Sequence, residues 1–563
     1  MLLEKITDET LKEIEKVQDY TLEELRKCFE VSNDTSKPNC TFFLLKIRSN
    51  AKELVQDFYN ALVNAKLEKI KDITIRGPSV SFNFNLALYG NEIISTILDK
   101  KQNFGKSTVG KGKTVLVEYS SPNIAKIFHI GHFRTTVLGN FIKKLYNFCG
   151  YKTVGINYLG DWGKQFGLVL LGYERYGSEE ELNLDPIKHL FDVYVAINKE
   201  AEDNEEVDAQ AKKIFEMMEN GNNEKYLELW KYFREISIEK YKKLYKKIGV
   251  EFDEYSGESL YEKKSKEAIQ KFDFAVKKED GSIYLDLDED NKPNVLKSDG
   301  TTLYLTRDIS AALDRVERYS PDKMLYVVSS EQKLHFEHLF KALNKLDCKC
   351  KNIEHVMYGM VSGMSTRKGT VKFLEDIIEI ATNVMLDEIN SNPKKAAQIE
   401  DIQYTALTLA ISTLVVMDFS AKRIKGYKFE VEKRAKNVSG TGSYIQYAHC
   451  RLVSIENKNS EVDPDEASPL VVSELDDAAI LNILYKLIWF EKTVLLCLDD
   501  YEPSRIVTYL NDLCGYLNSK NNELKVKGVE NEKAKARLRA FKCARIVIGN
   551  ALRLLGIDPL NKM

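Results

Sequence analysis

Two histidines, His129 and His132, lie three residues apart in the stretch SSPNIAKIFHIGHFRTT (120–136). Imidazole N–H groups can donate hydrogen bonds to phosphate oxygens. Gly131, between them, lets a ligand approach the backbone closely, and Lys126 and Arg134 add positive charge nearby. The stretch therefore predicts a site for a phosphate-bearing ligand, although histidines that only cap or pack a helix would show the same spacing.

The elements around this stretch predict an α/β fold. TVLVEYSS (114–121) reads as a buried strand, HFRTTVLGNFIKKLYNFCG (132–150) as a helix ending in glycine, and YKTVGINYLGDWG (151–163) as another strand and loop. Strand, helix and strand within roughly forty residues form a βαβ unit, which predicts a doubly wound parallel sheet of the Rossmann type. Ligands of such sheets bind beyond the carboxyl ends of the strands, where a helix N-terminus favours phosphate.

The remaining chain predicts three parts. Residues 1–105 alternate helical and strand-like patterns and predict a small α/β module. Residues 106–375 predict the sheet domain, with a charged, mostly helical insertion at about 176–290 that contains a hairpin at Asp280–Gly281. Residues 376–563 read as helix after helix and predict an all-α domain.

Composition narrows the class of protein. The 82 Lys and Arg against 85 Asp and Glu give a net charge of −3, so any contact with a polyanion must come from local basic patches. The nine scattered cysteines lack the paired spacing of a zinc site and predict reduced core thiols and no metal centre. The acidic start is unlike a targeting peptide, and we recognise no apolar run of 18 residues. These features predict a cytoplasmic protein with no membrane partner.

Five motifs resemble one family. HIGH (129–132) after a strand resembles the nucleotide-binding signature of class I aminoacyl-tRNA synthetases, and its surroundings are similar to the arginyl-tRNA synthetase pattern SPNIAKxFHxGHxR. In family order follow NYLGDWGKQFG (157–167), TTLYLTRD (301–308), GMVSGMSTRKG (359–369) in place of the KMSKS loop, and SYIQYAHCRL (443–452). The resemblance implies a Rossmann catalytic domain, an N-terminal module that contacts tRNA, and an anticodon-binding C-terminal domain.

The resemblance also implies the reaction. ATP, with Mg²⁺ and no organic cofactor, activates L-arginine as arginyl-adenylate, and the arginyl group then moves to the terminal ribose 2′-hydroxyl of tRNA(Arg). Family members are commonly monomeric. Such chemistry depends on positioning and on positive charge around the phosphates. The catalytic residues implied are His129, His132, Lys126, Arg367 and Lys368. The residues implied to bind ATP are His129, Gly131, His132, Met360, Val361, Met364, Ser365 and Lys368.

This chain departs from the family at one position. Gly363 stands where the first lysine of KMSKS is expected, and the resemblance suggests that Lys126 replaces the missing charge. The register of the loop leaves both Arg367 and Lys368 open as the match to the second lysine, and we favour Lys368.

Arginine recognition is expected from a carboxylate, because a guanidinium is planar, forked and permanently charged. Asp308 and Tyr304 share a face if a helix begins there, and by resemblance they contact the guanidinium. Glu258 is a second acceptor by resemblance, with a surface capping role as the alternative. The residues implied to hold the rest of the substrate are Ser121, Pro122, Asn123, His132 and Gln332.

The C-terminal helices interleave cations with tyrosines, which suits phosphates and splayed bases. The residues predicted to bind tRNA are Arg434, Lys436, Tyr444, Tyr447 and Arg451. Two other functions remain open on the residues alone: a ligase that adenylates a carboxylate without tRNA, and an inactive tRNA-binding paralogue.

Overall fold

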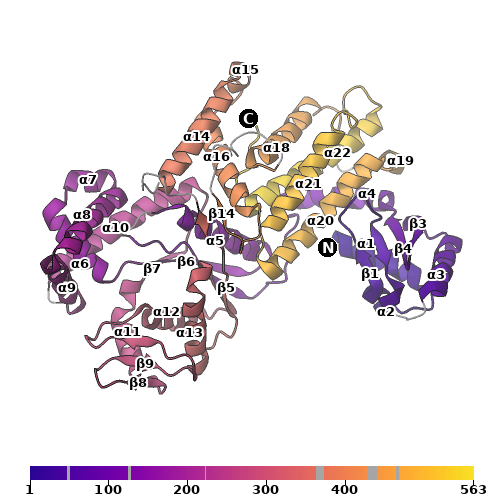
Figure 1. The fold of residues 1–563 in the computed structure, drawn as a ribbon. Coiled ribbons are helices and arrows are strands. Elements are labelled where there is room, and N and C mark those ends of the chain that lie inside the picture. Colours follow the sequence, from indigo (N-terminus) through magenta and orange to yellow (C-terminus); the bar gives the residue numbers. More distant parts are fainter. Residues whose placement is uncertain (47–50, 125–127, 222, 363–372, 429–439, 464–467) are drawn as a thin grey trace.

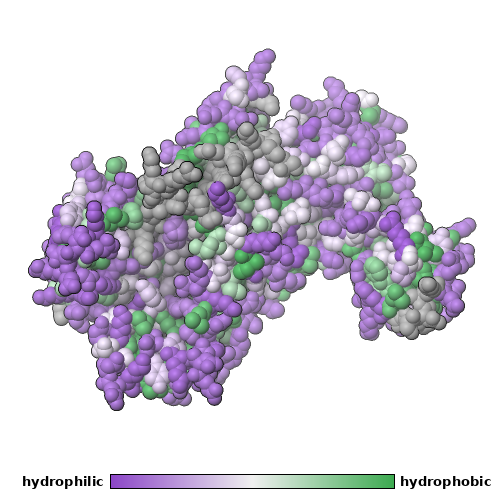
Figure 2. All heavy atoms as spheres, in the orientation of Figure 1, coloured by the Kyte–Doolittle hydropathy of each residue, from purple (hydrophilic) through white to green (hydrophobic). Residues whose placement is uncertain are grey.

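The computed structural model describes residues 1–46, 51–124, 128–221, 223–362, 373–428, 440–463 and 468–563. A five-stranded sheet lies near the centre of the molecule (Figure 1). The N-terminal module lies at the right of this view, a helical insertion at the left, and the C-terminal helices along the top. Hydrophilic side chains cover most of the face drawn in Figure 2.

The central sheet has the strand order β12-β11-β5-β6-β7, and all its pairs are parallel. Its strands are β5 (Thr114–Glu118), β6 (Lys152–Leu159), β7 (Glu254–Gly257), β11 (Lys323–Tyr326) and β12 (Ile353–His355). The helices that follow β5, precede β11 and follow β11 are α5 (Ile130–Phe148), α12 (Tyr304–Tyr319) and α13 (Lys333–Lys345). The predicted doubly wound sheet is confirmed. Because β5 pairs with β6 on one side and β11 on the other, the winding reverses at β5, which is where such sheets bind ligands.

Helix α5 packs unusually close to the chain that leaves β5. A Cβ added at Gly139 would lie 2.2 Å from Cβ of the buried Tyr119, so only glycine permits this approach. Four of the five residues of β5 are buried, as its β-branched run predicted. The carboxyl end of β5 and the amino end of α5 are therefore held by a tightly packed pair of elements.

Two insertions extend the sheet domain. Five helices separate β6 from β7: α6 (Lys164–Tyr176), α7 (Glu179–Leu184), α8 (Pro186–Asp203), α9 (Glu205–Glu219) and α10 (Glu224–Lys247). Between β7 and α12 lie α11 (Glu262–Ile269), β8 (Ala275–Lys277), β9 (Ile283–Leu285) and β10 (Asn294–Leu296). The predicted hairpin is confirmed, because β8 and β9 pair antiparallel around Gly281, whose φ is +86°.

The N-terminal module contains an antiparallel sheet of order β1-β2-β4-β3. Its elements are α1 (Leu2–Glu15), α2 (Leu22–Cys28), β1 (Phe29–Val31), β2 (Cys40–Phe42), α3 (Ala51–Ala65), β3 (Ile70–Arg76), β4 (Ser79–Phe84) and α4 (Gly90–Lys100). One continuous apolar core joins this module to the C-terminal helices, since α1 and α4 pack against α20 and α22. The predicted domain limits stay predictions.

The C-terminal part is built from α14 (Leu374–Asn390), α15 (Pro393–Ala396), α16 (Ile402–Phe419), α18 (Gly442–Lys458), α19 (Val472–Leu475), α20 (Ala478–Asp500), α21 (Ser504–Lys520) and α22 (Asn531–Leu554). Within the described ranges, α16 alone is long and apolar enough to cross a membrane, by length and composition only. The expectation of no such run is thus wrong, because serines and threonines break up its apolar appearance in the sequence. Of this window, 78% is buried inside the protein, where α16 packs between α14 and α18.

All nine cysteines are free and buried, which confirms the prediction of reduced core thiols. Burial raises the pKa of the Cys450 thiol to about 12, so that thiol is protonated at neutral pH.

Candidate active site

A strained turn follows β5. Ser120 and Ser121 adopt left-handed backbone angles, with φ of 72° and 47°, which are rare for residues other than glycine. Hydrogen bonds hold the turn: Ser120 Oγ lies 2.7 Å from both Thr136 Oγ1 and Tyr245 Oη, and the Ser121 N–H donates to Asn157 Oδ1 at 3.1 Å. Strain held in this way marks a preorganised site.

The same turn is fixed to the loop after β6. The Gly160 N–H donates to the Pro122 carbonyl at 3.1 Å, and Asn123 forms a parallel bridge with Gly160. Ser121, Pro122 and Asn123 therefore lie together at the carboxyl edge of the sheet, beside the β6 strand end. This is the arrangement expected for residues that hold a substrate's polar end.

The two histidines cap α5. His129 is the N-cap residue: its Nδ1 accepts a hydrogen bond from the Gly131 N–H at 3.0 Å, and its own N–H donates to His132 Nδ1 at 3.1 Å. Since both Nδ1 atoms accept, the proton of each neutral ring is on Nε2, which is a donor. Burial lowers the pKa of His129, so its neutral form is favoured. The capping alternative and the donor role are thus compatible, because they use opposite ring nitrogens.

Arg134 does not add charge at this helix end, so that interpretation is wrong. Its guanidinium is 1% exposed, lies 3.5 Å from Asp418, and donates to the carbonyls of Gly359 at 2.5 Å and Arg423 at 2.9 Å. It also packs 5.2 Å from the Tyr427 ring centroid. Arg134 therefore ties α5 to α16 and to the segment that leads into the predicted nucleotide loop.

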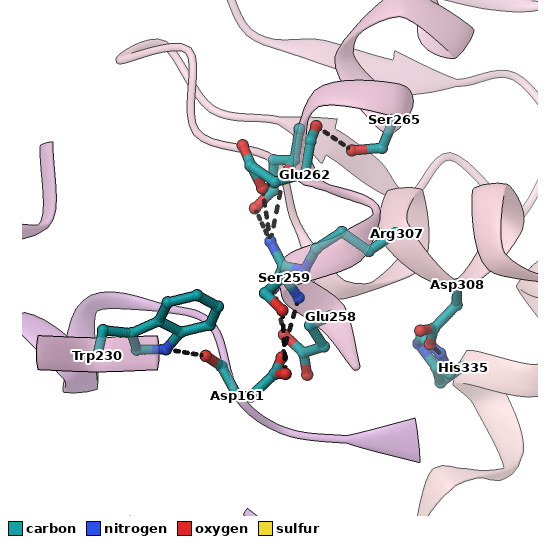
Figure 3. Close-up of polar contacts among 10 residues, drawn as sticks. Asp161, Trp230, Glu258, Ser259, Glu262, Ser265, Arg307, Asp308 and His335 are labelled. Carbon is teal, nitrogen blue, oxygen red and sulfur yellow. Dashed lines mark hydrogen bonds and ion pairs between the residues drawn. The ribbon is translucent and has the colours of Figure 1, made fainter. Parts of the chain in front are cut away.

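A histidine from the neighbouring helix holds the carboxylate of Asp308 (Figure 3). Helix α12 begins at Tyr304, one turn before Asp308, so the condition under which these two residues share a face is met. His335, on α13, places Nε2 at 2.7 Å from Asp308 Oδ2. Burial lowers the pKa of His335, but the hydrogen bond and charge of Asp308 outweigh burial and raise that pKa above 6.5. The pair therefore favours an imidazolium where recognition of a guanidinium was predicted.

Glu258 lies in the same group of charges but already has a partner. Its Oε2 accepts from Arg307 Nη2 at 2.8 Å, and both side chains are largely buried. Burial raises the pKa of Glu258, with Arg307 opposing and Asp308 adding to the rise. The Arg307 guanidinium also lies 5.1 Å from the ring centroid of Tyr304, which is 58% exposed. Arg307 thus joins Glu258 to the predicted guanidinium contacts.

Asp161, in the GDWG motif, holds the segment that carries Glu258. It is fully buried and accepts a hydrogen bond from Arg234 Nε at 2.6 Å. It also accepts from the Ser259 N–H at 2.9 Å, and its carbonyl accepts from Trp230 (Figure 3). A Cβ added at Gly257 would lie 2.1 Å from Asp161 Oδ2, so glycine is required beside it. These contacts give Asp161 a structural role, because both of its carboxylate oxygens are held by other side chains or backbone groups.

Sequence reasoning missed four side chains of this group. They are His335, Arg307 and the buried ion pair of Glu118 and Arg315. Glu118 is the last residue of β5. Burial raises the pKa of Glu118, the charge of Arg315 lowers it, and the nearby charge of Asp308 raises it further. The carboxyl end of β5 is thereby linked to the start of α12. His335 carried a signal, because it follows Gln332 by one helical turn.

Of the other residues predicted to contact arginine or ATP, some lie within the described residues and some outside them. Gln332 is exposed after β11, Met360 is 50% exposed, and Val361 begins the short strand β13 (Val361–Ser362), which pairs with β14 (Tyr427–Lys428). The rest of the loop and its supporting lysine lie outside the described residues; these are Lys126, Gly363, Met364, Ser365, Arg367 and Lys368.

Comparison with known proteins identifies the family. Residues 93–431 match the family described as tRNA synthetases class I (R), catalytic domain, and residues 445–563 match the DALR anticodon binding domain. The arginine–tRNA ligase of Encephalitozoon cuniculi is 53% identical over 540 residues, which is 95% of each chain. The chain belongs to the class I arginyl-tRNA synthetases. It is therefore an enzyme, an ATP-dependent ligase.

Further comparisons agree with this family. The probable cytoplasmic arginine–tRNA ligase of Dictyostelium discoideum is 42% identical over 525 residues, 88% of each chain. The crystal structure of the Plasmodium falciparum arginyl-tRNA synthetase superposes with a TM-score of 0.76 at 21% identity over 99% of each chain. The Thermus thermophilus arginyl-tRNA synthetase superposes with a TM-score of 0.75 at 18% identity, covering 95% of this chain and 96% of the other. At such identities these likenesses show the fold.

In this synthetase, α18 carries the predicted tRNA contacts that the structure describes. Tyr444 and Tyr447 are half-buried, and Tyr447 lines a cavity of about 210 Å³ together with Met563. Arg451 donates to Asn518 at 3.4 Å. Arg434 and Lys436 lie outside the described residues. Part of each tyrosine side chain is thus covered by the protein, which restricts how a base could stack on it.

Proposed function

We propose that this enzyme joins L-arginine to tRNA(Arg) through arginyl-adenylate, with Asp308 as the carboxylate that receives the substrate guanidinium. The observation that carries the assignment is the Asp308–His335 pair, a carboxylate that already binds a planar nitrogen ring at 2.7 Å. A guanidinium can replace the imidazole and offer two parallel N–H donors instead of one. Tyr304 supplies an exposed ring one turn away.

The substrate amino and carboxylate groups are assigned to the turn after β5 and to Gln332. The strained backbone at Ser121 and the bridge from Asn123 to Gly160 hold this turn before substrate arrives. Such preorganisation lowers the entropic cost of bringing the arginine carboxylate to the α-phosphate. Glu258 is assigned as a second guanidinium acceptor that shares its charge with Arg307.

ATP is assigned to the amino end of α5. The Nε2–H groups of His129 and His132 donate to phosphate oxygens, whose charge grows as the arginine carboxylate attacks the α-phosphate and pyrophosphate leaves. Gly131, Met360 and Val361 line the nucleotide. Lys126, Met364, Ser365, Arg367 and Lys368 are proposed to complete the site with cationic and backbone contacts.

Magnesium is proposed to reach the site with ATP. Among the residues that the structure describes, no group of three or more His, Cys, Asp and Glu side chains could hold a metal ion. Mg²⁺ bound to nucleotide phosphates needs few protein ligands, so the residues present fit a metal carried by the substrate. When bound, it would neutralise phosphate charge.

Transfer RNA is proposed to extend from the N-terminal module (1–105), past the catalytic domain (106–375), to the anticodon-binding domain (376–563). Its contacts are assigned to Arg434, Lys436, Tyr444, Tyr447 and Arg451. The enzyme is proposed to act as a monomer in the cytoplasm, without a membrane partner. The relatives include proteins named cytoplasmic and proteins named mitochondrial.

The test is exchange of labelled pyrophosphate into ATP, measured with arginine or citrulline and with or without tRNA(Arg). We expect exchange with arginine, none above background with citrulline, and dependence on tRNA. Citrulline is neutral and isosteric, so it would leave the carboxylate of Asp308 without an ion-pair partner. Equal exchange with citrulline would refute the guanidinium assignment, whereas tRNA-independent exchange would favour the ligase that acts without tRNA.

A further inference from the structure

A basic cavity of about 590 Å³ lies where three parts of the chain meet. It is bounded by residues 102–106 after α4, the second half of α5, the end of α10 with residues 249–251, and the last turn of α22. Five of its lining side chains are cations and one is a carboxylate; these are Lys106, Lys143, Lys144, Lys246, Arg553 and Glu251. We call this site the junction cavity.

Most of this positive charge lacks a neutralising carboxylate. Lys143 is paired with Asp253 at 2.8 Å. Within the described residues, the ammonium groups of Lys144 and Lys246 make no hydrogen bond or ion pair, and Lys246 is exposed. Burial lowers the pKa of Lys144, against the attraction of Asp558. The charges of Asp558 and Glu251 attract this half-buried ammonium but do not make up for its burial, and an anion in the cavity would reduce that cost.

The guanidinium of Arg553 shows the same imbalance. Its one hydrogen bond within the described residues is a long contact of 3.4 Å to Asn550 Oδ1. Burial lowers the pKa of Arg553, the charge of Asp558 raises it, and the charge of Arg545 lowers it further. The side-chain amides of Asn103, Asn140 and Asn147 also line the cavity and can donate to oxygens. Cations with amide donors around a concave space suit a compact polyanion.

The junction cavity is separate from the ATP site. Lys144 lies fourteen residues beyond Ile130 on α5, which at 1.5 Å per residue places its backbone roughly 21 Å from the capping histidines. The cavity volume falls within the range of small-molecule sites, roughly 300–1,000 Å³. Its charge therefore lies away from the phosphate donors at the start of α5.

We propose that the junction cavity binds a small polyanion with closely spaced phosphate groups. Phosphates at the centre of the cavity face Lys106 from the segment that follows α4, Lys144 from α5 and Arg553 from α22. The ligand joins three parts that otherwise repel one another at this point, so its binding stabilises their arrangement. Ligand binding to the folded state alone raises the melting temperature.

Inorganic triphosphate is the probe, titrated calorimetrically into the full chain whose catalytic site is filled by a non-hydrolysable ATP analogue that occupies the phosphate positions. We expect one further binding site and a rise in melting temperature with wild type. The double variant Lys144→Met, Lys246→Ala should lose at least tenfold in triphosphate affinity. Lys243→Ala is the matched control, because Lys243 is an exposed lysine one turn earlier on α10 that does not line the cavity.

Three results would overturn the proposal. One is no triphosphate binding beyond the filled catalytic site, and another is equal loss of affinity in the control variant. The third is a tenfold loss of tRNA(Arg) affinity in the double variant while triphosphate binding is unchanged, since the cavity would then belong to the tRNA path. Circular dichroism and aminoacylation of the double variant show that it is folded, because neither lysine takes part in the proposed reaction.

Discussion

The Asp308→Asn substitution tests the arginine site most directly. Asparagine has nearly the same shape as aspartate but carries no charge, so the site keeps its volume and loses its ion pair. We expect kcat/KM for arginine to fall steeply and the effect to appear mainly in the arginine KM. The KM for ATP should change little, because the nucleotide contacts lie at the amino end of α5.

The magnitude follows from the exposure of the pair. The side chain of Asp308 is 22% exposed, so water screens it only in part. Removing one partner of a fully buried ion pair costs about 3–5 kcal/mol, and a hydrogen bond to a charged group contributes about 1.5–3 kcal/mol. We expect a loss of about 3 kcal/mol for this partly screened pair, which corresponds to roughly a 150-fold fall in kcat/KM.

The assay is tRNA-dependent pyrophosphate exchange over a range of arginine concentrations. Asp314→Asn is the matched control: Asp314 lies on the same helix, is 16% exposed, and bonds Lys264, Tyr261 and Arg318 rather than the proposed substrate. The control should lower the melting temperature without raising the arginine KM. If Asp308→Asn kept the wild-type arginine KM within threefold, the guanidinium assignment would be refuted.

Three further predictions follow from the pKa values and the packing. The pKa of His335 is raised, so at low pH its positive charge competes with arginine for Asp308. As pH rises through that pKa the charge is lost, and the arginine KM should fall. His335→Asn should make the arginine KM nearly independent of pH over the same range. Burial lowers the pKa of His449 from 6.5 to about 4, so its neutral form contributes stability above pH 6.5 that is lost as pH falls toward 4. That shift corresponds to about 3 kcal/mol of unfolding free energy. His449→Gln should therefore reduce the fall in melting temperature between pH 7 and pH 4.5. An unchanged fall would show that His449 does not cause this pH dependence. Gly139→Ala should lower the free energy of unfolding by about 1–3 kcal/mol, because the added Cβ would overlap the buried Tyr119. Gly515→Ala, where the added Cβ meets open space, should instead raise the melting temperature. Differential scanning calorimetry measures both changes.

Local pattern predicted the elements of the catalytic sheet because that pattern depends on near neighbours. The buried run at β5, the glycine that ends α5 and the turn at Gly281 all express short-range backbone preferences. The apolar length of α16 was missed because hydroxyl side chains look polar in a sequence, although in a helix they bond the preceding turn, as Ser412 does to the Thr408 carbonyl.

The sequence alone determined which chemistry this chain carries: the order of its motifs, the histidines at a helix start and the carboxylate at 308 all follow from residue type and spacing. Tertiary structure decided which group each charge meets. Arg134 pairs with Asp418 and not with a ligand at the start of α5, and His335 hydrogen-bonds Asp308. Four segments that are separate in the sequence line the junction cavity. The physical reason is distance along the chain, because an ion pair depends on atoms brought within about 4 Å by packing between residues that local periodicity does not relate.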